Sequence, residues 1–205
     1  DGFAGRGIEL YSDESQQGEL TAEWIADRTS MLSSLLKSWP LPDNQQPTDY
    51  QAKDGFDYQD IVSGIDVLVM PDPVGGFNPL VHRVYFGGDS ADVLEGNKGN
   101  DRLYGGGGTD ILKGEAGHDY LEGGSGNDQF YGGKGNDTLV GGADNDHLYG
   151  GEGNDLLKGD AGDDHYYYEK NSGYDIIEDE SGSNTLHLFG RAVGKIYVID
   201  GSTYE

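Results

Sequence analysis

The chain has 205 residues, of which 36 are Gly, only 34% are hydrophobic and none is Cys. This composition argues against a single conventional apolar core, and the lack of Cys excludes disulfides, thiolate metal sites and a Cys nucleophile. With 38 acidic and 13 basic residues, the net charge of −25 at pH 7 disfavours nucleic acid and anionic membranes as partners and favours cations.

Residues 1–86 differ in composition from the rest and are interpreted as an α+β flanking or capping segment. Apolar residues recur at helical spacing between positions 20 and 39, and Pro40 ends the run, so one amphipathic helix is predicted there. Downstream, the pattern predicts a hairpin from 56–62 and 65–70, and then a strand over 80–86. Because the chain begins at Asp1, we expect a fragment of a longer protein.

Nine consecutive nonapeptides fill residues 87–167. Each opens with Gly, carries Asp at the sixth place and has a bulky apolar residue at the eighth; one reads Gly132-Gly133-Lys134-Gly135-Asn136-Asp137-Thr138-Leu139-Val140. The pattern matches the nonapeptide signature of calcium-binding parallel β-helix repeats. The predicted fold is therefore all-β, a parallel β-roll (β-solenoid). Residues 168–205 hold weakened repeats and are expected to form a short β cap that includes a strand over 196–199.

Two nonapeptides are expected to form one turn, with a strand at the last three places and a loop at the first six. Because side chains alternate along a strand, the eighth place should point inward and the ninth outward. The inward set is Leu94, Leu103, Leu112, Leu121, Phe130, Leu139, Leu148, Leu157 and Tyr166. The outward set includes Tyr104, Lys113, Tyr131, Tyr149 and Lys158.

The sixth-place carboxylates should form two ladders with a spacing of ~4.8 Å. One contains Asp92, Asp110, Asp128, Asp146 and Asp164, and the other contains Asp101, Asp119, Asp137 and Asp155. Adjacent unneutralised carboxylates repel by about 1 kcal/mol in water, and by more when buried. Calcium, which takes about six to eight oxygen ligands, would remove this repulsion, so folding and calcium binding should be coupled. Counting gaps within the ladders predicts about seven Ca²⁺ sites.

The block closely resembles the RTX (repeats-in-toxin) family, tightly over 87–167 and loosely over 168–187. The resemblance implies that carbonyls of the first and third places and the Asp of one repeat bind each ion with carbonyls of the second and fourth places and the Asp two repeats on. The implied carbonyl ligands are Gly105, Gly107, Gly114, Ala116, Gly123, Gly124, Ser125, Gly126, Gly132, Gly133, Lys134, Gly135, Gly141, Gly142, Ala143, Gly151 and Gly153. Sites that draw on departures from the pattern should be weak or empty, namely those at Ser90, Asn97, Glu115, Asp144 and Asp160.

The sequence gives little support for a catalytic site. No H-E-x-x-H occurs, and the near matches to G-x-S-x-G lie within repeats, so the fragment is not expected to be an enzyme. His118, His147 and His165 are interpreted as surface residues. The tyrosines Tyr104, Tyr131, Tyr149 and 166–168 form either ordinary strand surface or a stripe that binds glycan or a partner.

The main hypothesis is a non-enzymatic module that stays unfolded at low cytosolic calcium and folds outside the cell, where such sites have Kd on the order of 10⁻⁴–10⁻³ M. The RTX resemblance implies type I secretion from a Gram-negative bacterium, passage of the unfolded chain through the export channel, and support for a larger toxin, adhesin or exoenzyme. Two alternatives stay open: a glycan- or host-surface-binding adhesin fragment, and the C-terminal part of an RTX lipase or protease. We expect a secreted or cell-surface monomer without a transmembrane segment.

Overall fold

The computed structural model describes residues 55–60, 65–69, 81–169, 172–179, 181–189, 194–200 and 203–204, together with Ala26 and Thr29. The helix predicted over 20–39 lies outside the described residues, apart from Ala26 and Thr29, which are helical. Every described element with defined bounds is a β-strand. In this part of the chain, no helix has the length and apolar character needed to cross a membrane.

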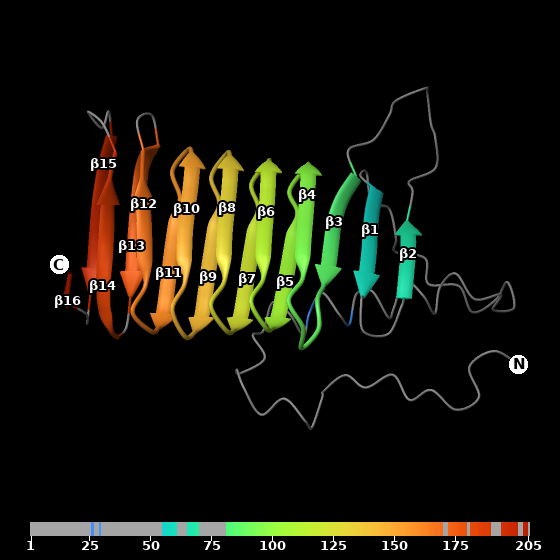
Figure 1. Ribbon diagram of the computed structural model, residues 1–205. Helices are drawn as coiled ribbons and strands as arrows, with labels where there is room; N and C mark the ends of the chain where they lie inside the picture. Colours follow the sequence, from blue (N-terminus) through green and yellow to red (C-terminus); the bar gives the residue numbers. More distant parts are fainter. Residues whose placement is uncertain are drawn as a thin grey trace, which may run out of the picture.

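The strands form two sheets (Figure 1). The nine-stranded sheet contains, in spatial order, β15 (Gly194–Asp200), β13 (Gly173–Asp179), β11 (Leu156–Ala161), β9 (Thr138–Ala143), β7 (Tyr120–Ser125), β5 (Arg102–Gly107), β3 (Val81–Phe86), β1 (Gly55–Asp60) and β2 (Ile65–Val69). The seven-stranded sheet contains β16 (Thr203–Tyr204), β14 (Ser183–Leu188), β12 (His165–Tyr168), β10 (His147–Glu152), β8 (Gln129–Lys134), β6 (Ile111–Ala116) and β4 (Val93–Lys98).

Within the repeats, strands of the same sheet pair in parallel with partners 18 residues apart. Leu121 pairs with Leu139 in one sheet, and Phe130 pairs with Leu148 in the other. Two nonapeptides therefore make one turn, as predicted, and about six turns stack over residues 84–198. Successive strands along the chain run in opposite directions because each loop returns the chain to the other sheet (Figure 1).

The strands are longer than the sequence analysis predicted. In the central repeats each strand has six residues and covers the last three places of one nonapeptide and the first three of the next, as in β9. Pairing includes the second place, where Gly124 lies opposite Gly142. Glycines without side chains allow this close approach, so only the fourth to sixth places are left as a loop.

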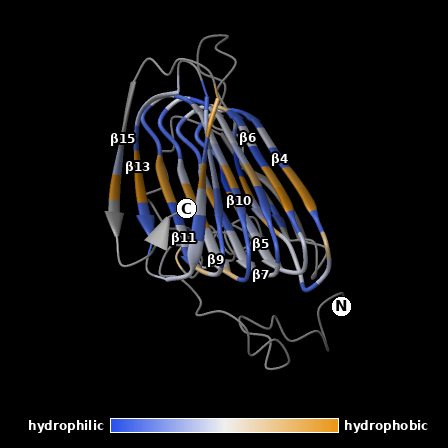
Figure 2. Ribbon diagram, turned by 60° about the vertical axis from the view of Figure 1, so that its left-hand side comes forward, coloured by the Kyte–Doolittle hydropathy of each residue, from blue (hydrophilic) through white to orange (hydrophobic). Residues whose placement is uncertain are grey.

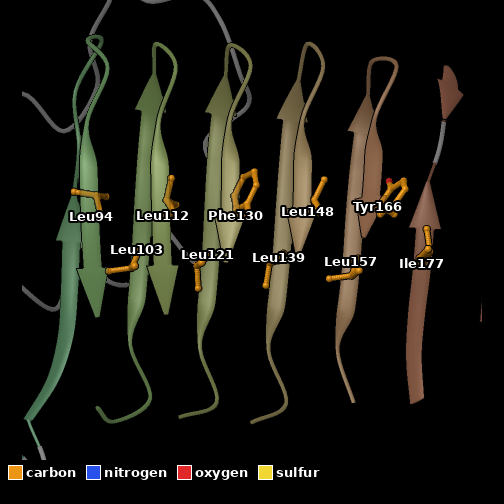
Figure 3. Packing of buried hydrophobic residues seen from close by; sticks show 10 residues of the cluster. All are labelled: Leu94, Leu103, Leu112, Leu121, Phe130, Leu139, Leu148, Leu157, Tyr166 and Ile177. Carbon is orange, nitrogen blue, oxygen red and sulfur yellow. The ribbon is translucent and has the colours of Figure 1, made fainter. Parts of the chain in front are cut away.

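The eighth-place residues form the core. All nine are buried, with at most 3% of each exposed, and Ile177 extends their cluster. Figure 3 shows them as two rows, one from each sheet, with Leu112, Phe130 and Leu148 in one row and Leu121 and Leu139 in the other. The rows appear in Figure 2 as hydrophobic bands that cross the strands. Each turn thus adds only two side chains to a thin core.

The prediction that ninth-place residues face solvent is wrong for Tyr104. It is only 1% exposed, and its ring stacks on Phe86 at a centroid distance of 5.2 Å and lies 5.9 Å from the ring of Tyr120. Tyr131, at the same place on the other sheet, is 37% exposed. The outer face of the nine-stranded sheet is therefore covered near β3, β5 and β7.

Both flanks of the repeats continue the sheets. β1 and β2 pair antiparallel as the predicted hairpin, with Phe56 opposite Val69, and β1 joins β3 in parallel. After the last repeat the register shifts to 20 residues, so that Leu157 pairs with Ile177. The strand predicted over 196–199 lies within β15. The domain boundaries at 86 and 167 stay predictions.

Candidate metal centre

Glycines with positive φ shape the loops between the sheets. The second-place Gly124 and the fourth-place Gly126 have φ of +104° and +109°. A Cβ on Gly126 would overlap the carbonyl oxygen of Gly108, one turn earlier. Consecutive loops therefore stack backbone against backbone, and side chains at these places would prevent that contact.

Four of the five departures from the glycine pattern keep the same backbone. Asn97, Glu115 and Asp160 at the second place and Asp144 at the fourth have φ of 80°, 76°, 67° and 75°. This left-handed conformation costs a non-glycine residue about 1–2 kcal/mol. Ser90, in the first loop, does not adopt it. The weak binding expected at these loops stays a prediction, but only the first loop departs in backbone shape.

The neighbouring turn fixes one oxygen of each ladder carboxylate. Oδ1 of Asp110 accepts a hydrogen bond from the backbone N–H of Asp92 at 2.8 Å. The same bond, from the N–H of one Asp to Oδ1 of the Asp 18 residues later, recurs along both ladders at 2.8 to 3.0 Å. These bonds set the direction in which the other oxygen of each carboxylate points.

That other oxygen is buried without a partner. Oδ2 has no hydrogen bond in the ladder residues Asp101, Asp110, Asp119, Asp128, Asp137, Asp146, Asp155 and Asp164. Each of these side chains is at most 3% exposed. An unpaired buried carboxylate oxygen is costly, so eight in regular array indicate a missing cationic partner.

The space around each Oδ2 is kept open by the first-place glycine. A Cβ on Gly96 would lie 2.5 Å from Oδ2 of Asp101 and 2.8 Å from the carbonyl oxygen of Gly114. The same pair, a sixth-place Oδ2 and the first-place carbonyl of the next turn, faces the glycines up to Gly141. Hard oxygen atoms thus converge where any side chain would fill the space.

Burial raises the pKa of these carboxyl groups far above the ordinary Asp value. Desolvation is the main cause, opposed by the backbone hydrogen bond to Oδ1 and reinforced by neighbouring carboxylates. It raises the pKa of Asp110 to about 6, that of Asp128 and Asp137 to about 7, and that of Asp146 to about 9. Without a cation, the folded roll therefore retains protons at neutral pH.

The donor chemistry fits calcium. In the described part of the chain, no three His, Cys, Asp or Glu side chains gather around one point. An ion between loops must therefore combine a few carboxylate oxygens with backbone carbonyls, a set of hard ligands typical of Ca²⁺ rather than Zn²⁺. The orphan oxygens and the glycine-kept space fit this requirement.

Comparison with known families gives the same result. The family model of the RTX calcium-binding nonapeptide repeat, of the haemolysin type, matches the chain in four copies, over residues 86–121, 106–139, 113–147 and 140–169. Residues 86–169 are RTX repeats. No match was found among the curated proteins or among the solved structures. RTX repeats imply calcium binding and are typical of type I-secreted extracellular bacterial proteins.

The Asp residues of each predicted ladder stack in the structure, and only Asp92 differs in its surroundings. Asp92 is only half-buried, and its Oδ2 accepts the backbone N–H of Gly88 within its own loop at 2.9 Å. Its carboxylate thus has a protein partner that the other ladder residues lack, and its role as a metal ligand stays a prediction. The carbonyl ligands implied by the RTX resemblance, and the number of ions, stay predictions.

Asp175 is a ladder residue that was not predicted from the sequence. It is 2% exposed, burial raises its pKa to about 6, and its Oδ1 accepts the N–H of Asp155 at 3.0 Å. It therefore continues the ladder that ends with Asp155. The signal was the pair Gly173 and Asp175, which keep the spacing of the fourth and sixth places after the two-residue slip.

A second ladder of the RTX repeats, at the fifth place, was also missed. Side chains there accept the backbone N–H of the fifth-place residue in a neighbouring turn: Asn100 from His118, His118 from Asn136 through Nδ1, and Asn136 from Asn154. His118 is exposed as expected, but it takes part in this ladder. The frequent Asn at this place was the available signal.

The outer face of the seven-stranded sheet carries a column of stacked rings. Tyr131, Tyr149, Tyr167 and His187 follow one another at centroid distances of 4.9, 3.9 and 4.6 Å, with interplanar angles of 13° or less. Beside the column, Nδ1 of His147 lies 2.8 Å from the hydroxyl of Tyr167. Of the tyrosine stripe considered from sequence, Tyr104, Tyr166 and Tyr168 are buried instead, so only its members on this face remain.

Proposed function

We propose that this chain is a calcium-triggered folding module of a larger secreted protein. It stays unfolded at low cytosolic calcium, passes through a type I secretion channel, and folds in extracellular millimolar calcium. The observation that carries the proposal is the set of eight buried Asp Oδ2 atoms without hydrogen-bond partners, seven of which face a space kept open by glycine; beside the eighth, that of Asp164, lies the hydroxyl of Tyr166. Only a cation supplied from outside the chain satisfies all of them.

The thin core supports coupling between folding and binding. Each turn buries two eighth-place side chains, while ordering each residue costs roughly 1–2 kcal/mol and glycines cost the most. The acidic repeats add mutual repulsion when the carboxylates ionise. Calcium then provides both the missing ligand contacts and the charge neutralisation, so binding free energy becomes folding free energy.

The role in the larger protein is proposed from the same physics. Folding outside the cell opposes back-sliding through the channel and stabilises adjacent domains of a toxin, adhesin or exoenzyme from a Gram-negative bacterium. The module itself is proposed to be non-enzymatic. Its most perturbed carboxyl groups, such as those of Asp128 and Asp146, belong to the ladder and lie 0% exposed, out of reach of a substrate.

The glycan-binding alternative has less support. Sugar rings pack on the faces of aromatic side chains, but the faces of Tyr149 and Tyr167 are covered by one another at 3.9 Å and by their neighbours in the column. Tyr149 and Tyr167 therefore present mainly ring edges to solvent. Glycan-array binding that is lost in Tyr149→Ala would favour this alternative.

The decisive test is far-UV circular dichroism of the whole chain during a calcium titration from chelator to ~10 mM, with magnesium as the control. We expect a cooperative coil-to-β transition with calcium and none with magnesium. A β spectrum that is unchanged by chelator, in protein shown by elemental analysis to hold no metal, would rule out the calcium switch.

A further inference from the structure

The turn that follows the last repeat differs from all earlier turns at the places that face the ions. At the first place, Tyr168 and Asp179 stand where the repeats have Gly. The pairing of Lys158 with Glu178 places Asp179 next to Gly159 of the preceding turn. At the sixth place, Asn184 replaces the ladder Asp and accepts the N–H of Asp164 at 2.7 Å.

The hydroxyl of Tyr166 occupies the space that earlier turns keep open. Tyr166 is an eighth-place residue, and in an earlier turn the ring of Phe130 at that place approaches Gly123. The additional hydroxyl of Tyr166 reaches past the ring, to the point beside Gly159 where Oδ2 of Asp164 also lies. There it donates a buried hydrogen bond to Oδ2 of Asp179. A protein hydroxyl and a carboxylate thus meet where earlier turns bring Oδ2 and a backbone carbonyl together.

The other ladder ends in a similar way. Tyr168 is 3% exposed, and its hydroxyl donates to the carbonyl oxygen of Gly173 at 2.8 Å. Gly173 occupies the fourth place, whose carbonyl belongs to the ligand scheme implied by the RTX resemblance. Tyr168 therefore binds an oxygen that an ion between the loops of Asp155 and Asp175 would need.

Two further polar groups of this turn have protein partners, although Oδ2 of Asp164, in the preceding loop, has no hydrogen bond. The Asn184 amide donates to the carbonyl of Ser181 at 3.1 Å, and Oδ1 of Asp179 accepts the N–H of Ser181 at 3.1 Å. The amide of Asn184 removes one negative charge from the ladder, and the carboxylate of Asp179, where the repeats have Gly, supplies one beside it.

We propose that tyrosine hydroxyls close both calcium ladders: Tyr166, with Asp179 and Asn184, and Tyr168, with Gly173, take the places of the last ions. The turn over residues 168–188 is then a cap held by protein hydrogen bonds, and calcium sites end with the loops of Asp155 and Asp164. This inference rests on the proposed function, because it locates the end of the same calcium sites.

The first test counts ions by native mass spectrometry in calcium and follows backbone hydrogen exchange in the same samples. In Tyr166→Phe and Tyr168→Phe we expect the ion count of the wild type. Amides that link the cap to the preceding turn, those of Ile176 and Thr185, should exchange about tenfold faster or more, because a buried hydrogen bond is lost. Tyr167→Phe is the matched control, since its ring belongs to the outer column, and it should change neither readout at these amides. Loss of one ion in Tyr166→Phe or Tyr168→Phe would overturn the proposal, because the hydroxyl would then be a calcium ligand.

The second test rebuilds the missing site. The variant Tyr166→Phe/Asp179→Gly/Asn184→Asp restores the repeat pattern at all three places and should bind one more ion than the wild type. A folded triple variant with the wild-type count would contradict the proposal; if it does not fold, the single tyrosine variants decide. A wild-type chain that binds no calcium would instead refute the proposed function, so the two failures are distinguishable.

Discussion

The central turns of the roll, residues 105–158, and its last turn, residues 168–188, follow a similar backbone path with different loop chemistry. Central loops bury carboxylates whose Oδ2 atoms have no partner, as in Asp128 and Asp137. In the last turn, Asp179 and Asn184 have their hydrogen bonds supplied by the chain itself. The same stacked geometry can thus be completed either by an ion or by protein donors.

The difference matters for how the fold depends on conditions. A central turn without calcium holds buried carboxyl groups whose Oδ2 atoms have no partner, whereas the last turn holds the amide of Asn184 and the carboxylate of Asp179, which have protein partners. The central turns should therefore respond most strongly to calcium, and the last turn should respond mainly to mutations of its tyrosines.

The largest expected effect is that mild acid partly replaces calcium in the central turns. The folded-state pKa of Asp101, Asp128, Asp137 and Asp155 is about 7, above the unfolded value near 4. The folded metal-free roll therefore binds more protons than the unfolded chain between these values, and its stability falls as pH rises from about 4 to 7. In chelator, far-UV circular dichroism should show more β structure at pH 5.5 than at pH 8.

Two controls accompany this comparison. Sedimentation must show monomers at pH 5.5, because the isoelectric point of the chain is near 4.2 and solubility falls close to it. Protonation of His147 cannot cause the gain of β structure at low pH. Burial lowers the pKa of His147 in the folded chain, so its protonation favours the unfolded chain. Equal β content at both pH values would mean that the buried carboxyl groups do not limit folding of the central turns.

The next largest effect is expected from leucine-to-alanine substitutions, which compare the packing of the core in the two regions. Leu139 is fully buried between Leu121 and Leu157, and Leu139→Ala should lower the free energy of unfolding by about 2–5 kcal/mol in saturating calcium. Leu186 is only half-buried, so Leu186→Ala should cost about 1 kcal/mol. Urea unfolding measures both. Equal losses would show that the last turn is as tightly packed as the centre.

Many features of the central turns could be predicted from the sequence, because nine repeats in phase indicate the loops, the core and the ladders together. The glycines predict where loops stack, the eighth place predicts the core rows, and the sixth place predicts the ladders. All nine eighth-place residues are buried as predicted, and eight of the nine ladder Asp residues present an unpartnered Oδ2. The exception, Asp92, lies in the first repeat, where no earlier repeat loop stacks below it.

The wrong and missed predictions concern residues whose surroundings the nine-residue period does not determine. Tyr104 occupies an outward place but is buried, and its ring stacks on Phe86, which precedes the repeats and lies outside their pattern. Asp175 was missed because the two-residue slip after Tyr167 breaks the count, although the pairing of Leu157 with Ile177 shows that the stacking resumes. From the sequence, Tyr166 is predicted only as a core residue. The periodicity shows which face of the strand it occupies, but not which oxygen its hydroxyl contacts.

A smaller effect, on the calcium midpoint of folding, is expected from single substitutions in the Asp ladder. Asp128→Asn keeps the size of the side chain and removes the charge shared by the sites on either side. Loss of a charged ligand contact worth about 1.5–3 kcal/mol should raise the calcium midpoint about tenfold to a hundredfold. Asp163→Asn removes the same charge at an exposed fifth place, where the amide oxygen can still accept the N–H of Ser183, and should leave the midpoint unchanged. Calcium titrations of both variants followed by circular dichroism provide the comparison, and equal shifts would mean that only net charge matters.

The smallest effect concerns the backbone that both regions share. Glu115 has φ of 76° and lies in register with Gly133, one turn later, which has φ of +109°. Glu115→Gly should raise the free energy of unfolding by up to about 1 kcal/mol, because relief of left-handed strain exceeds the entropy cost of glycine. Gly133→Ala should lower it by about 1–3 kcal/mol, because its Cβ would meet the carbonyl of Glu115. Opposite signs in calcium-saturated urea unfolding would show that the second place selects glycine for conformation; a loss of stability in both variants would show that Glu115 contributes through its side chain instead.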